Sequence, residues 1–331
     1  MPRFAALHQT GPVASRPLRL EERPQPRPGQ GEVLVEVAAC CVCRTDLQVV
    51  EGDLEPHALP IVPGHQVVGR VRAAGRGVEL AEGARVGVAW LASACGTCDQ
   101  CRAGHENLCR FATFTGWDRD GGFAEVMTAD HRFVHPLPDA FDDVDAAPLL
   151  CGGAIGYRSL RVCGVLPGQR LGLYGFGASA TIAIQVAVHW GCEVYVCTRS
   201  AAEQQRALDL GAVWASGYDR SPPEPLHAAV TFAPVGDVVV RALAAVDRGG
   251  TVAINAIHLD AIPTFDYGLL WWERSLRSVA NLTRCDVVEL LALAVEIPIV
   301  TSHDDYPLAA VNDALADLAQ GRVGGAAVVV T

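Results

Sequence analysis

The spacing of hydrophobic residues changes character about 150 residues into the chain. Before that point, short apolar runs rich in β-branched residues are separated by Gly and Pro, as in EVLVEVAAC (32–40) and HQVVGRVRAAG (65–75). This pattern is typical of short strands joined by turns. We therefore expect residues 1–147 to form a β-rich domain, antiparallel or barrel-like.

Beyond residue 148, apolar strand patterns alternate with helical ones. The predicted strands lie at 169–177 (with the turn that follows), 193–198, 227–234, 249–256 and 276–280, and the predicted helices at 178–191 and 200–211. Strands that alternate with helices imply right-handed crossovers and a parallel sheet. We therefore expect an α/β domain over 148–280. Two further helices (287–295 and 306–321) and a strand (328–330) are expected to return to the first domain.

Composition narrows the classes of function. The chain has 331 residues, which favours two domains, and a formal net charge of −11, which argues against nucleic acid and anionic membranes as partners. All 26 basic residues are Arg. The lack of lysine excludes Schiff-base, pyridoxal-phosphate and P-loop lysine chemistry. No apolar run reaches the length of a membrane span or a signal peptide, so we expect a cytoplasmic protein with reduced thiols.

Four of the twelve cysteines lie close together in the run CGTCDQCRAGHENLC. They are Cys95, Cys98, Cys101 and Cys109. Two C-x-x-C steps followed by a gap of seven residues bring four thiolates within reach of one tetrahedral ion, as in closed structural zinc sites. A pair of disulfides is the alternative, but nothing else in the sequence indicates an oxidising compartment.

A glycine-rich turn follows the first predicted strand of the α/β domain. Gly175, Gly177 and Ala180 form G-x-G-x-x-A, between a strand and a helix. In this context the first glycine permits a tight turn, the second admits a pyrophosphate, and the small third residue lets helix and strand pack closely. The sequence therefore predicts a dinucleotide site.

The end of the next predicted strand bears on the choice of dinucleotide. NAD-binding members of this motif class place an acid there for the ribose hydroxyl. Here the run is Thr198, Arg199 and Ser200, which contains no acid. A guanidinium can clamp a 2′-phosphate, so we predict that NADP(H) is preferred to NAD(H). The alternative is that Arg199 is a solvated residue at the start of a helix.

Three separated stretches carry residues suited to a second metal site. They are CVCRTD with Cys43, PGHQ with His65, and PLLCGG with Cys151. Two thiolates and an imidazole leave a fourth position open, as catalytic zinc sites do. The wide spacing of the three stretches does not establish this site by itself.

Taken together, these motifs resemble those of the medium-chain zinc-dependent alcohol dehydrogenase family over essentially the whole chain. The resemblance rests on C-x-T-D at 43–46, P-G-H at 63–65, the four-cysteine run, TGWDRDGGFAE, PLLC, GFGASA and the C-terminal return. It implies a GroES-like catalytic domain (1–147), a Rossmann domain with a doubly wound parallel sheet (148–280), and a segment that completes the first domain (281–331).

The resemblance also implies roles for individual residues. Cys43, His65 and Cys151 would hold a catalytic zinc, and the four-cysteine run a structural one. Asp46 would orient His65. Thr45 would bond the substrate oxygen and begin its proton path, while Gln48 stands where many relatives have a relay histidine and cannot titrate near neutral pH.

Two further features follow from the same resemblance. Gln66 replaces the glutamate that usually follows the zinc histidine, which removes a negative charge near the metal. An apolar substrate pocket would be lined by Leu54, Trp90, Phe114 and Trp117.

We therefore predict a zinc-dependent alcohol dehydrogenase or aldehyde reductase that carries two zinc ions per chain. It would transfer hydride between a small primary alcohol or aldehyde and a nicotinamide cofactor. Family analogy implies a homodimer or homotetramer. The alternatives are a zinc-dependent reductase of another carbonyl or double bond, and a non-catalytic nucleotide- or zinc-binding member of the family.

Overall fold

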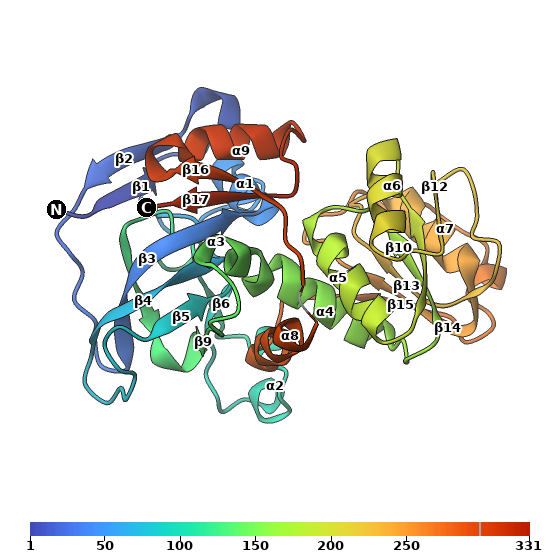
Figure 1. Ribbon diagram of the computed structural model, residues 1–331, viewed down its shortest axis with the longest axis horizontal. Coiled ribbons are helices and arrows are strands. Elements are labelled where there is room, and N and C mark those ends of the chain that lie inside the picture. The colour runs from blue at the N-terminus through green and yellow to red at the C-terminus, as the bar shows by residue number, and fades with distance from the viewer. Residues whose placement is uncertain (298) are drawn as a thin grey trace. The chain divides into compact units, whose positions relative to one another are not determined.

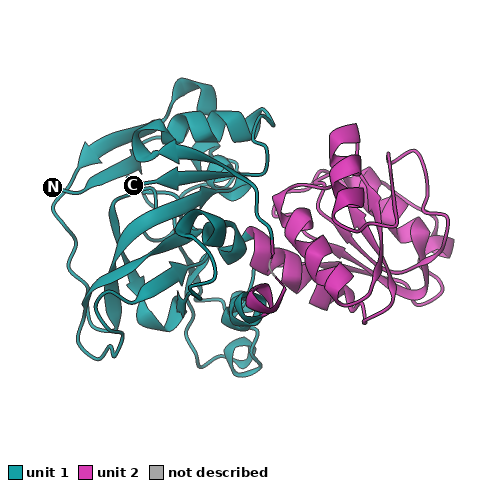
Figure 2. Cartoon of the chain, viewed as in Figure 1, with its two compact units in different colours: residues 1–151, 281–292, 300–331 teal, residues 152–280, 293–299 magenta. Residues whose placement is uncertain are grey.

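A computed structural model describes residues 1–297 and 299–331. The described residues divide into two compact units (Figure 2). Unit 1 comprises 1–151, 281–292 and 300–331, and unit 2 comprises 152–280 and 293–299. The first boundary lies after Cys151, where the sequence placed it after residue 147, and 293–299 belong to unit 2, where the sequence assigned them to the first domain.

Unit 1 is built around strand β3 (Glu32–Val42). In the described residues β3 belongs to a seven-stranded sheet of order β16-β17-β3-β4-β5-β9, and β8 also pairs with β3 (Figure 1). The other members are β4 (Val67–Ala74), β5 (Arg85–Val88), β8 (Val126–Asp130), β9 (Val134–Pro136), β16 (His303–Pro307) and β17 (Ala326–Val330). All pairs except β16–β17 are antiparallel, so the β-rich first domain is confirmed.

Smaller elements complete unit 1. Two short ribbons, β1-β2 and β6-β7, lie outside the main sheet. Their strands are β1 (Arg3–Leu7), β2 (Leu18–Glu22), β6 (Leu91–Ser93) and β7 (Thr113–Phe114). The helices are α1 (Arg44–Glu51), α2 (Asp99–Arg102), α3 (Asp143–Ala146) and α9 (Val311–Ala319), with short 3₁₀ turns η1 (Val13–Ser15), η2 (Glu106–Leu108), η3 (His131–Phe133), η4 (Ala147–Leu150) and η6 (Leu308–Ala310).

The core of unit 1 follows from alternation along its strands. In β4, Val67 and Val71 are buried while Arg70 and Arg72 are exposed. Because successive side chains of a strand point to opposite faces, this alternation buries one face of β4 and exposes the other at its arginines, although Val68 on that second face is buried too. The long central strand β3 is buried along most of its length and holds the sheet together.

Unit 2 contains a parallel sheet, as predicted. In its described residues six strands follow the order β12-β11-β10-β13-β14-β15. They are β10 (Arg170–Tyr174), β11 (Glu193–Cys197), β12 (Trp214–Ser216), β13 (Leu226–Thr231), β14 (Val246–Ile254) and β15 (Ser275–Ser278). The helices are α4 (Gly152–Cys163), α5 (Ala178–His189), α6 (Ala201–Asp209) and α7 (Gly236–Ala245), with the turn η5 (Tyr267–Leu269). This strand order is that of a doubly wound nucleotide-binding fold.

The C-terminal segment differs from its predicted form at one helix. The sequence predicted a helix over 306–321, but α9 begins only at Val311, because Tyr306 and Pro307 end strand β16. The residue before a proline is disfavoured in the helical region, which keeps Tyr306 extended. α8 (Arg284–Glu296) precedes this segment. None of the helices in the described part of the chain is long and apolar enough to cross a membrane.

Candidate metal and cofactor sites

Cys43, His65 and Cys151 come together within unit 1. Cys43 is the residue before α1, His65 lies in the turn before β4, and Cys151 follows η4. Their ligand atoms all lie within 4.8 Å of one another. Only folding brings these residues together, since 22 and 86 residues separate them along the chain.

Asp46 connects the first two of these residues. One carboxylate oxygen accepts the backbone N–H of Cys43 at 2.8 Å. The other lies 2.9 Å from Nδ1 of His65 and accepts the backbone N–H of Gly64 at 3.0 Å. Asp46 is 1% exposed. With Nδ1 held by a carboxylate, Nε2 of His65 is the nitrogen left to bind a metal.

The backbone at Gly64 requires glycine. Its φ is +98°, and an added Cβ would lie 2.8 Å from the backbone nitrogen of Phe123. L-amino acids rarely adopt this conformation, and the backbone of Phe123 leaves no room for a side chain. Gly64 therefore sets the direction in which the following residue, His65, enters the site.

The electrostatics of the trio favour a bound cation. Burial opposes protonation of His65, but Asp46 and Cys43 outweigh it and raise the pKa of the imidazole to about 10. A hydrogen bond from Cys151 lowers the pKa of the Cys43 thiol well below its ordinary value, against the effect of burial. A buried carboxylate and an easily ionised thiol concentrate negative charge here, and a divalent cation can neutralise it. The donor set therefore fits zinc.

Three polar residues surround the trio. Thr45 is buried, and its hydroxyl lies 3.8 Å from the Cys43 sulfur. Gln48 is half-buried on the next turn of α1. Gln66 is buried, and its amide donates to the carbonyl of Cys41 at 3.2 Å. Gln66 therefore acts as a neutral donor to the backbone of β3, a role that the glutamate usual in the family could not fill when ionised.

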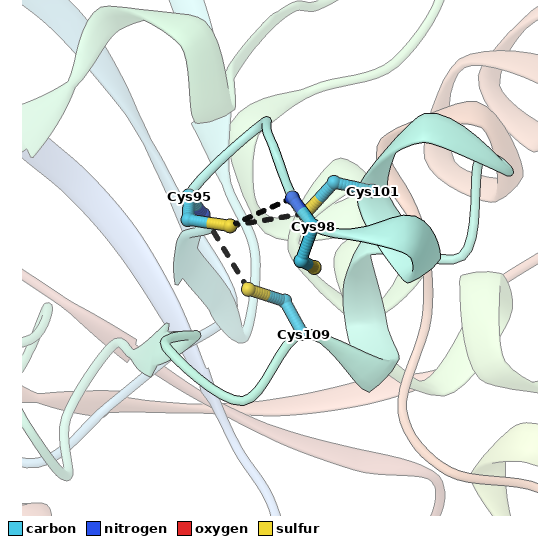
Figure 3. Close-up of side chains that lie close together, drawn as sticks. All are labelled: Cys95, Cys98, Cys101 and Cys109. Atoms are coloured by element: carbon cyan, nitrogen blue, oxygen red, sulfur yellow. Dashed lines mark hydrogen bonds between the residues drawn. The ribbon is translucent and has the colours of Figure 1, made fainter.

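The four cysteines of the C-x-x-C run also converge (Figure 3). The sulfurs of Cys95, Cys98, Cys101 and Cys109 lie within 4.8 Å of one another. All twelve cysteines of the chain are free of disulfides, so the disulfide alternative is not realised in this structure.

The geometry of this cluster fits a tetrahedral ion. The sulfurs of Cys95 and Cys101 are 3.8 Å apart. Four sulfurs placed at the Zn–S distance of about 2.3 Å would be separated by about 3.8 Å along each edge of the tetrahedron. The backbone N–H of Cys98 points to the Cys95 sulfur at 3.4 Å, and hydrogen bonds from Thr97 and Cys98 lower the pKa of Cys95 to about 6. The Cys95 thiol therefore ionises readily and suits a metal, whereas burial raises the pKa of Cys101 to about 12.

The glycine-rich turn lies in unit 2 where the sequence placed it, between β10 and α5. Gly175 has a φ of +93°, and a Cβ there would lie 2.8 Å from the backbone nitrogen of Ala233. At Gly177, by contrast, an added Cβ would meet no atom within 4 Å. Ala180 is fully buried in the first turn of α5. An open backbone before a 12-residue helix suits the pyrophosphate of a dinucleotide.

An acid in the first turn of α6, Glu203, lies against the residue that follows β11. Thr198 is buried and donates its hydroxyl to Glu203 at 2.5 Å. Ser200 caps α6 by accepting the backbone N–H of Glu203 at 3.4 Å. Arg199 is exposed, and its guanidinium makes no hydrogen bond or ion pair with the described residues. Arg199 therefore has no carboxylate partner among the described residues, while the Glu203 carboxylate is bonded to Thr198.

Arg206 is a residue near this site that the sequence gave no reason to select. Its guanidinium donates to the carbonyl of Phe176 at 3.3 Å and lies 5.8 Å from the centre of the Phe176 ring. Phe176 is the residue between the two glycines of the turn. Arg206 therefore braces the glycine turn from α6.

Three of the four predicted pocket residues contact one another in unit 1. Trp90 stacks on Phe114 and on Trp117 at centroid distances of 5.3 and 6.0 Å, and Phe114 lies 5.6 Å from Trp117. Trp90 also meets His65 edge-on at 4.7 Å. Leu54 is half-buried and packs on the core of unit 1. Trp90, Phe114 and Trp117 therefore form an aromatic cluster that contacts His65 of the candidate catalytic site.

The chain is similar to known alcohol dehydrogenases in sequence and in structure. Residues 29–139 match the family model "Alcohol dehydrogenase GroES-like domain". A probable alcohol dehydrogenase, AdhA, of Mycobacterium tuberculosis is 48% identical over 97% of this chain and 95% of its own length. An alcohol dehydrogenase of Geobacillus stearothermophilus is 33% identical over 93% and 94%. The solved structure of a cobalt- and zinc-bound thermostable alcohol dehydrogenase from Pyrobaculum aerophilum aligns with a TM-score of 0.90, at 26% identity over 100% of this chain and 99% of that one.

Proposed function

The chain belongs to the medium-chain alcohol dehydrogenase family and is an alcohol dehydrogenase, and we propose that it is a zinc-dependent one acting on primary alcohols and aldehydes. The observation that carries the proposal is the convergence of Cys43, His65 and Cys151 within 4.8 Å. Two thiolates and one imidazole leave a fourth position for substrate. The zinc-bound relative from Pyrobaculum aerophilum supports the choice of metal.

In the proposed mechanism Cys43, His65 and Cys151 would hold zinc, which would supply a Lewis acid to stabilise negative charge on the substrate oxygen. Asp46 fixes the Cys43 backbone and the His65 ring, so the ligands are held in place before substrate binds. Trp90 packs against His65 and excludes water from that side.

Thr45 is proposed to relay the proton of the alcohol: its hydroxyl accepts that proton as it passes its own to water. Its hydroxyl is buried beside the Cys43 sulfur and can both accept and donate a hydrogen bond. Gln48 lies one turn along α1 and cannot titrate near neutral pH. Gln48 can therefore orient a water or a hydroxyl, while the proton itself leaves through solvent.

We also propose that the chain binds a nicotinamide dinucleotide in unit 2, with NADP(H) preferred. Gly175, Gly177 and Ala180 are assigned to the pyrophosphate turn. Arg199 would hold the 2′-phosphate, because its guanidinium is exposed and unpaired among the described residues. The negative charge of Glu203 would disfavour a bound 2′-phosphate and so opposes this preference. Its hydrogen bond with Thr198 fixes the position of one carboxylate oxygen.

Replacing Arg199 with alanine is expected to weaken NADPH binding by about ten- to a hundredfold, the equivalent of one charge-assisted hydrogen bond. Binding of NADH should change little, and Thr198→Asp should shift the preference towards NADH. The measurements are dissociation constants for both cofactors and initial rates of oxidation of a panel of primary alcohols with NAD⁺ and NADP⁺. The alcohol panel tests the proposed function directly.

The matched control is Arg19→Ala, which removes an exposed arginine from β2 of unit 1. This variant should bind both cofactors as the wild type does. Tighter binding of NADH than of NADPH by the wild type would show that Arg199 is only a surface residue and that Glu203 dominates the site.

Self-association into a homodimer or homotetramer is proposed from the family resemblance. Strand β15 is an edge of the unit 2 sheet in the described residues, and Trp271 and Trp272 near it are exposed. An uncovered sheet edge beside apolar side chains favours pairing with another chain. Light scattering measures the assembled mass.

A further inference from the structure

A cluster of aromatic rings connects the proposed catalytic site to the surface of unit 1, through the contacts of Trp90 with Trp117 and of Trp117 with His57. It consists of Trp90, Phe114, Trp117 and His57, which we call the aromatic ladder. Trp90 lies at the inner end, against His65, and is 6% exposed. At the outer end the His57 imidazole stacks on Trp117, with ring centroids 4.3 Å apart and an angle of 31° between the planes. The His57 side chain is 58% exposed.

Hydrogen bonds hold the outer end of the ladder in one arrangement. The indole N–H of Trp117 donates to the carbonyl of Glu55 at 2.8 Å. Asp118 accepts the backbone N–H of Phe114 at 2.8 Å through one carboxylate oxygen, and its other oxygen bonds Nδ1 of His57. The loop that carries His57 and the turn that carries Trp117 are therefore joined twice.

These bonds leave one polar atom of His57 for a ligand. Because an ionised carboxylate only accepts, Asp118 assigns the proton of the neutral ring to Nδ1. Nε2 makes no hydrogen bond with the described residues. This nitrogen accepts a hydrogen bond when the ring is neutral and donates one when it is protonated. A hydroxyl group satisfies it in either state.

We propose that His57 is a specificity-determining residue that binds a neutral hydroxyl group on an aryl alcohol, at the end of the ring opposite the carbinol. The inference rests on the proposed function, since the carbinol must reach the site at Cys43, His65 and Cys151. The indole rings of the ladder favour an aromatic substrate through stacking. Asp118 neutralises the charge of a protonated His57. A carboxylate substituent on the substrate would therefore gain little binding free energy from His57.

The test uses benzyl alcohol, 4-hydroxybenzyl alcohol and 4-carboxybenzyl alcohol with the wild type and His57→Phe. In the wild type, kcat/KM for 4-hydroxybenzyl alcohol is expected to exceed that for benzyl alcohol by about three- to tenfold, the effect of one neutral hydrogen bond. The difference should lie in KM, because the contact is remote from the reacting carbon. The carboxylate should bring no such gain. Quenching of tryptophan fluorescence gives the matching dissociation constants.

Phenylalanine keeps a ring on Trp117 and removes both nitrogens. In His57→Phe the preference for the hydroxyl should therefore disappear, so that kcat/KM for 4-hydroxybenzyl alcohol and for benzyl alcohol agree to within about twofold. The control His8→Phe removes a histidine that pairs with Glu21, away from the ladder, and should keep the preference.

The outcomes separate the two claims. Oxidation of benzyl alcohol reports on the proposed function, and the ratio between the substrates reports on His57. A wild-type ratio near one, or a ratio that His57→Phe retains, would overturn the inference and show that His57 and Asp118 only join the loop to the turn. The proposed function would stand in either case.

Discussion

Replacing Cys151 with serine is expected to abolish alcohol oxidation while the protein stays folded. A catalytic zinc supplies several kcal/mol of stabilisation to the charge on the substrate oxygen, which corresponds to a loss of about a thousandfold or more in kcat/KM. Cys43 and His65 would remain, but two ligands hold zinc far less firmly than three. The measurement is the steady-state rate with a primary alcohol, together with circular dichroism and the melting temperature.

The matched control for this variant is Cys285→Ser. Cys285 is exposed on α8 and belongs to neither cysteine cluster. Its replacement should leave kcat/KM and zinc content unchanged. If Cys151→Ser kept the wild-type rate, the trio would not be the catalytic centre. If it unfolded, the melting curve would show this before any rate was interpreted.

Replacing Cys98 with serine is expected to act on stability instead of chemistry. Zinc bound by four thiolates contributes folding free energy and leaves no open position for substrate. A loss of several kcal/mol would lower the melting temperature by about 5 °C or more in a chain of this size. The rate per folded molecule should stay close to that of the wild type.

Differential scanning calorimetry and limited proteolysis measure the effect of Cys98→Ser. Cleavage should concentrate in the segment from Cys95 to Cys109, whose sulfurs would no longer share an ion. Two results would contradict the structural role: an unchanged melting temperature, or a loss of turnover in protein that remains folded.

The local motifs could be predicted from the sequence because each depends on short spacing. The four cysteines span 15 residues, and the glycine turn six, so the chain itself brings those groups together. Alternating and helical patterns also identified the described strands of unit 2 except β12, but in unit 1 they identified β3, β4 and β17 and not β1, β2, β5, β6, β7 or β16. The trio of Cys43, His65 and Cys151 needed the family resemblance, because its members are far apart along the chain.

Other features depend on contacts that no local pattern encodes. The stacking of His57 on Trp117 joins residues 60 positions apart, and nothing around His57 marks it as different from any exposed histidine. The hydrogen bond between Thr198 and Glu203 depends on the position of α6 relative to the end of β11. The sequence contained a signal for the late start of α9, because Pro307 disfavours the helical backbone conformation at the residue before it.

The zinc content of the protein decides whether the two cysteine-containing clusters are metal sites. Elemental analysis of metal-replete protein should find two ions per chain, one on each ligand set. The expected values are two zinc ions for the wild type, one for Cys151→Ser with the fold intact, and one for Cys98→Ser with activity retained. One zinc ion or none in the wild type would contradict the account.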